Sequence, residues 1–76
     1  MPTIFIAYGL RFFFYADDHE PMHIHVAKGD DHAKIELEPR LRLVYNKGLK
    51  ASDLRRAIEL VSERSEEIAK AWHQYH

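Results

Sequence analysis

The sequence contains no cysteine and no long apolar run. The absence of cysteine excludes disulfide bonds, thiolate metal sites and thiol nucleophiles. No apolar run approaches the roughly 20 residues that a membrane-spanning helix needs, so no membrane partner is expected. The N-terminal segment has neither a basic stretch nor a small-residue cleavage site, which argues against a signal peptide and predicts a cytoplasmic protein.

Histidine is the residue type that the chain has in excess, with six in 76 residues. A chain of this length forms one domain, 1–76, and buries about 63% of its unfolded surface in a modest core. The net charge is −1 with neutral histidines. Because histidine titrates near neutral pH, these side chains are the first place to look for function.

The first part of the chain, about residues 1–46, is rich in β-branched and aromatic residues and predicts short strands separated by turns. Apolar and polar residues alternate most clearly in the third and fourth segments, which flank Gly29. The predicted strands are 3–8, 10–15, 23–28, 33–38 and 41–45.

A single long helix is expected over about 52–75. Ser52 is a suitable N-cap, and apolar residues then recur at steps of three and four as far as Trp72 and Tyr75. The predicted fold class is therefore α+β: an antiparallel sheet of four to five short strands, packed by one long C-terminal helix.

The first two predicted strands carry more aromatic side chains than one small core can bury. Both faces of this hairpin are apolar, and a helix can cover only one of them. The surplus predicts a protein interface, such as a homodimer through the N-terminal hairpin. Alternatively, Tyr15 stacks on RNA bases beside Arg11.

Two histidines, His23 and His25, alternate with apolar residues on the third strand and so share one face. Pairing Lys28 with Ala33 across the Gly29 turn places His25 opposite Glu36, and His23 opposite Glu38. Nearby carboxylates favour imidazolium, so the pKa of each histidine is expected to rise. The apolar pattern permits a register slip of two residues but not of one.

Three interpretations of this cluster stay open. The histidines are surface groups paired with glutamates, in a non-catalytic domain that binds a partner. Or His23 and His25 are the acid and base of a cofactor-free endoribonuclease, with Glu36 as their orienter and His19 as an accessory group. Or His19, His23 and His25 bind zinc or nickel, completed by Asp17 or Glu36. The remaining histidines, 32, 73 and 76, are expected to be solvated.

Charge is unevenly distributed along the chain. Residues 17–38 contain seven acids and two bases, whereas residues 40–56 contain six bases and one acid. A basic stretch of this kind is typical of surfaces that contact phosphate backbones. The candidate RNA contacts are Arg11, Tyr15, Arg40 and Arg42.

Several segments together resemble a small bacterial family named domain of unknown function 4160. They are the opening Met-Pro-Thr-Ile, the aromatic strand 9–15, the run His-Glu-Pro-Met-His-Ile-His-Val at 19–26, and Ala71-Trp72. The resemblance implies one component of a toxin–antitoxin-like pair, with a small protein encoded nearby as partner and RNA as a further ligand. It brings no settled activity with it.

Overall fold

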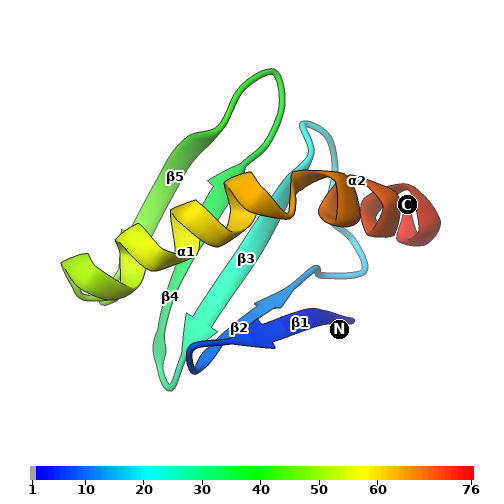
Figure 1. The fold of residues 1–76 in the computed structure, drawn as a ribbon. Coiled ribbons are helices and arrows are strands. Elements are labelled where there is room, and N and C mark those ends of the chain that lie inside the picture. Colours follow the sequence, from blue (N-terminus) through cyan, green and yellow to red (C-terminus); the bar gives the residue numbers. More distant parts are fainter. Residues whose placement is uncertain (1) are drawn as a thin grey trace.

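The computed structural model describes residues 2–76 and consists of a five-stranded sheet followed by two helices (Figure 1). The predicted α+β class is confirmed. The elements are β1 (Thr3–Ala7), β2 (Leu10–Phe13), β3 (His23–Lys28), β4 (Asp31–Glu36), β5 (Arg42–Lys47), α1 (Ala51–Glu63) and α2 (Ser65–Tyr75).

Each strand pairs antiparallel with the next one along the chain, so the sheet order is β1-β2-β3-β4-β5. Residues Tyr8 and Gly9 connect β1 to β2, with φ of 54° and 75°. A two-residue hairpin turn with both φ values positive matches the right-handed twist of the strands. Short connections of this kind explain why sequential strands are neighbours throughout the sheet.

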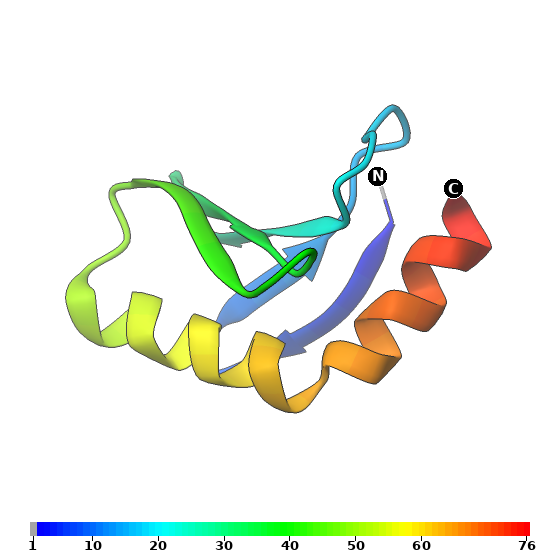
Figure 2. The ribbon, with the colours of Figure 1, turned by 90° about the horizontal axis from the view of Figure 1, so that it is seen from above.

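Both helices lie on the same face of the sheet, as Figure 2 shows. The inward side chains of β3 and β4, such as Ile24 and Ile35, are fully buried against Val61 and Ile68 in one cluster. Burial of apolar surface is the main stabilising contribution in such a core. The opposite face of the sheet has no helix over it.

The predicted single helix over 52–75 is wrong, because the chain breaks at Arg64 into two helices. Arg64 has φ −106° and ψ 24°, outside the helical region. The change of direction carries α2 toward the end of β2, where Trp72 meets Phe14 edge to face at 5.3 Å. The first helix also starts at Ala51 after Lys50, without a side-chain cap from Ser52.

The predicted bounds of β3 are confirmed, but the predicted register of β3 against β4 is wrong by two residues. Lys28 pairs with Asp31 around a two-residue turn, so His25 lies opposite Lys34 and His23 opposite Glu36. The tighter turn moves each pairing by two positions and leaves the buried apolar pattern unchanged.

The aromatic hairpin is divided between the two faces of the sheet. Phe12 and Phe14 belong to the core, whereas Phe13 is buried on the other face. Ile6 and Tyr8, on and beside the edge strand β1, stay well exposed. The homodimer through this hairpin therefore stays a prediction. None of the described helices is long and apolar enough to cross a membrane.

Gly48 offers a test of how β5 is connected to α1. Its φ is 102°, and a Cβ atom there would overlap the carboxylate of Asp31. We expect Gly48→Ala to lower the free energy of unfolding by about 1–3 kcal/mol, measured by urea denaturation. Gly29→Ala is the comparison: Gly29 has open space around it and a φ of 61°, which other residues can adopt, so its loss should be smaller. Equal losses in the two variants would contradict the steric argument.

Candidate metal centre

Three potential metal ligands, Asp18, His23 and His25, converge where the loop 14–22 meets β3. Nε2 of His23 lies 3.1 Å from Oδ1 of Asp18, and Nε2 of His25 lies 3.2 Å from the same oxygen. One ligand atom from each residue lies within 4.8 Å of the others. Within residues 2–76, these three side chains form the one group of three or more histidine or carboxylate side chains that is compact enough to hold a metal ion.

The local sequence explains why these residues meet. Alternation along β3 sends Ile24 into the core and the flanking histidines to the opposite face. The loop then folds back over that face through a turn in which the amide of Asp18 donates to the carbonyl of Tyr15 at 3.2 Å. In return, the amide of Tyr15 donates to Oδ2 of Asp18 at 2.8 Å, which leaves Oδ1 directed at the histidines.

Aromatic side chains enclose the two imidazoles. The ring of His25 stacks on Phe13 at 5.5 Å and meets Tyr15 edge-on at 4.6 Å. The ring of His23 lies 5.2 Å from Trp72, which comes from α2. The histidines are consequently only 4% and 5% exposed. The expectation that they lie on an open face is wrong, because the loop and Trp72 cover them.

Hydrogen bonding leaves one nitrogen of His23 without a hydrogen-bond partner. Its Nδ1 lies 2.8 Å from the carbonyl oxygen of Pro21, which can only accept, so Nδ1 carries a proton and donates. If the ring is neutral, Nε2 carries no proton, and its lone pair faces an oxygen of Asp18. That nitrogen is buried and does not meet the geometry of a hydrogen bond. A buried nitrogen in this position requires a cation or a proton for compensation.

The electrostatics favour a neutral His25 and an ionised Asp18 at neutral pH. Burial lowers the pKa of His25 and outweighs the opposing effect of Asp18, so the predicted rise is wrong for this residue. Burial also tends to raise the pKa of Asp18, but the hydrogen bond from the Tyr15 amide and the two neighbouring imidazoles lower it overall. The site therefore presents a carboxylate and a neutral imidazole.

A model of one protein family, the domain of unknown function (DUF4160), matches residues 9–73. The chain belongs to this family. The resemblance inferred from the sequence is thereby confirmed, and the match includes all three residues of the cluster. No curated protein and no solved structure matches this DUF4160 chain.

The other predicted site residues of the DUF4160 domain are not part of the cluster. His19 and Asp17 are exposed in the loop, and Asp18 lies with the histidines in their place. Glu36 lies opposite His23, but it accepts two hydrogen bonds from Arg42, at 3.1 and 3.2 Å. Among the predicted RNA contacts, Arg11 lies over Phe13 and Tyr15 borders His25, whereas Arg40 is exposed in the β4–β5 loop.

Asp18 is the residue that sequence reasoning missed. The sequence offers two adjacent aspartates, and only the second one turns inward. The sequence signal is that an aspartate side chain can bond backbone groups three or four residues earlier, and Asp18 does so with the amide of Tyr15. Of the three distal histidines, His73 is exposed and His32 half-buried. His76 is exposed but stacks on Trp72 at 4.1 Å.

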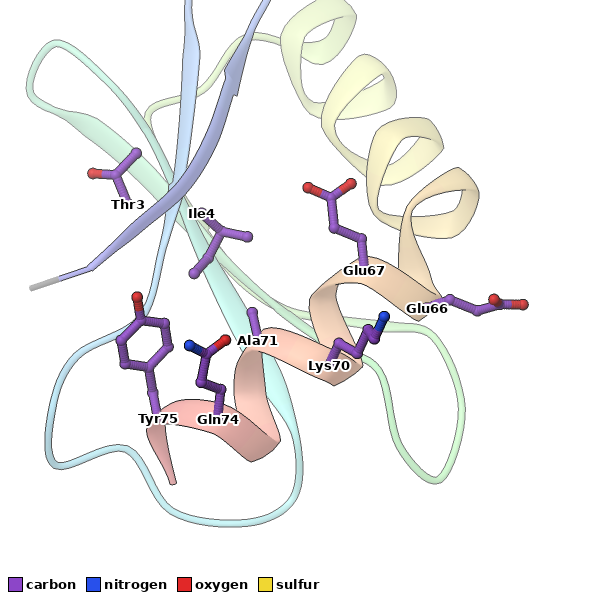
Figure 3. Close-up of a pocket in the computed structure, with 8 residues that line it drawn as sticks. All are labelled: Thr3, Ile4, Glu66, Glu67, Lys70, Ala71, Gln74 and Tyr75. Atoms are coloured by element: carbon purple, nitrogen blue, oxygen red, sulfur yellow. The ribbon is translucent and has the colours of Figure 1, made fainter.

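A separate groove of about 510 Å³ runs between the edge strand β1 and α2 (Figure 3). Thr3 and Ile4 line one side, and Lys70 and Tyr75 are among the helix residues on the other. None of the site residues predicted from the sequence lines this groove. The candidate metal ligands Asp18, His23 and His25 therefore lie on the other face of the sheet, outside this groove.

Acidification should destabilise the metal-free chain. Because the pKa of His25 is lowered by folding, the unfolded state binds more protons below about pH 6.5, and stability falls there. The lowered pKa of Asp18 adds a further loss at more acidic pH. Urea midpoints measured in EDTA should decrease from about pH 7.5 to about pH 5.5. His25→Gln should flatten this dependence, and an unchanged slope would contradict the assignment.

Proposed function

We propose that the protein is a metal-binding domain, with Asp18, His23 and His25 as ligands and Zn²⁺ as the ion that fits best. The observation that carries this proposal is the buried Nε2 of His23, which faces a carboxylate oxygen without a hydrogen bond. A divalent cation bound by that nitrogen and that oxygen would compensate both groups. Two histidines and one carboxylate are a common set of protein ligands for zinc.

The separations of the ligand atoms are compatible with one shared ion. Zinc–nitrogen and zinc–oxygen bonds of about 2.0–2.1 Å at a tetrahedral angle place two ligand atoms about 3.3 Å apart. The oxygen of Asp18 lies 3.1 and 3.2 Å from the two histidine nitrogens. These two separations are already close to the expected value, and the two nitrogens, which lie within 4.8 Å of each other, would complete the set.

The surroundings of the ligands also support metal binding. The bond from Nδ1 of His23 to Pro21 orients the ring, as the outer hydrogen bonds of metal-bound histidines do. The bond from the Tyr15 amide holds Asp18 in the same way. With three protein ligands, a fourth position is left for water or a small molecule.

Acid–base cleavage of RNA by His23 and His25 is less compatible with this geometry. Both imidazoles are buried, and the carboxylate of Asp18 lies between them. A scissile phosphate would have to occupy the same place, where like charges repel. The role in a toxin–antitoxin-like pair is a separate proposal that rests on the family resemblance alone.

Isothermal titration calorimetry of the untagged chain with Zn²⁺ tests the proposal. We expect one equivalent of zinc to bind and the unfolding temperature to rise, with about 2.7 kcal/mol of added stability at 100 times the dissociation constant. Asp18→Asn and His23→Gln should each weaken binding by more than about 100-fold, because even outer hydrogen bonds change metal affinity by 10- to 100-fold.

The matched controls are His19→Gln and His73→Gln, which remove exposed imidazoles outside the cluster. Both should bind zinc as the unmodified chain does. Circular dichroism establishes that every variant is folded. Absence of zinc binding by the folded chain, or full binding by Asp18→Asn and His23→Gln, would refute the proposal; titrations with Fe²⁺ and Ni²⁺ determine the order of preference.

A further inference from the structure

The helix-free side of the sheet carries a second set of residues with a shared character. The pairings place Phe13, His25, Lys34 and Tyr45 side by side in one row across β2 to β5. A neighbouring row runs from Arg11 through Ala27 and His32 to Lys47. We call this surface the open face and define it by Arg11, Tyr15, His32, Lys34, Tyr45 and Lys47. Figure 2 shows that neither helix lies over this side of the sheet, where the Trp72 side chain of α2 reaches only the ring of His23.

Cations are concentrated on the open face although the whole chain has a net charge of −1. Arg11, Lys34 and Lys47 come from three different strands, and none of them has a carboxylate partner among the ion pairs of residues 2–76. The nearby carboxylate of Glu36 is neutralised by Arg42 at 3.1 Å. Three unpaired cations on one side of a sheet produce a positive potential that attracts phosphates.

Aromatic rings lie between these cations. The ring of Tyr45 is half-buried, with His32 edge-on at 5.7 Å and the ammonium of Lys47 at 5.1 Å. Tyr15 lies in the loop beside the other end of this row, is 42% exposed and meets the rings of Phe13 and His25 edge-on. Rings held by their neighbours in this way can stack on bases at little entropic cost, and arginine or lysine beside them can contact the backbone.

We infer that the open face binds single-stranded nucleic acid. Bases would stack on Tyr45 and Tyr15, and the phosphates would contact Arg11, Lys34 and Lys47. The open face extends over four strands, β2 to β5, and some RNA-binding domains stack two or three bases on the surface of a four-stranded sheet. A protein partner would instead be expected to meet an apolar centre with few charges, whereas this surface alternates cations with rings. The inference does not rest on metal binding.

Fluorescence anisotropy with labelled RNA of about 12 nucleotides tests this inference. The titration is performed in EDTA, so that failure of the zinc proposal leaves the result interpretable. We expect saturable binding that weakens with salt. The double variant Lys34→Ala/Lys47→Ala should bind at least about tenfold more weakly and reduce the slope of log affinity against log salt by about 1.4, or 0.7 for each phosphate contact.

The matched control is Arg55→Ala/Lys70→Ala, which removes the same charge from exposed positions on the helices. It should bind RNA as the unmodified chain does. Tyr45→Ala should lower affinity by at least about fivefold, whereas Tyr45→Phe retains the ring and should lower it little.

Three outcomes would overturn the inference. The first is that the chain binds neither RNA nor single-stranded DNA. The second is that the two double variants lose equal affinity for RNA. The third is that the labelled RNA is displaced by an acidic peptide such as oligoglutamate but not by unlabelled RNA. The third outcome would instead identify the open face as a site for an acidic protein segment. A parallel titration with single-stranded DNA and with duplex RNA determines which form of nucleic acid is preferred.

Discussion

The structure depends on a sheet whose two faces are covered differently. Both helices pack against one face, so apolar side chains there form the core, and the other face must be completed by the loop 14–22 and by side chains of the strands. On that face the buried residues are Phe13, His23 and His25, and covering them requires polar compensation as well as packing. Asp18 provides part of this compensation, and the proposed metal ion would provide the rest.

The sequence allowed prediction of the features that follow from local pattern. Alternation on β3 predicts its bounds and the common direction of His23 and His25, because the period of a strand is two residues. The register of β3 against β4 depends on the length of the turn between them. The observed two-residue turn and the longer predicted turn bury the same side chains, so the alternation does not distinguish them. The break at Arg64 has no counterpart in the apolar pattern, which continues through it as far as Trp72, and it accompanies the packing of Trp72 against Phe14 at the end of β2.

The sequence predicted the types of residue in the candidate site, but not which residues of those types form it. Three histidines near one another suggested imidazole ligands, yet His19 points to solvent and an aspartate replaces it. Which of Asp17 and Asp18 turns inward depends on the backbone of the loop. The direction of the pKa shift of His25 also depends on the tertiary structure. Burial beside Phe13 and Tyr15 lowers the pKa by more than the carboxylate of Asp18 raises it.

The proposed metal centre and the open face meet at Tyr15. Its amide holds Asp18, while its ring borders His25 and forms one end of the open face. A divalent ion at the cluster would bind the loop to β3 and replace a local negative charge with a positive one. Both effects act in the same direction on a phosphate strand: they hold the ring of Tyr15 in place and remove the repulsion from Asp18. Since coupling between two ligands is reciprocal, nucleic acid on the open face would strengthen metal binding by the same factor.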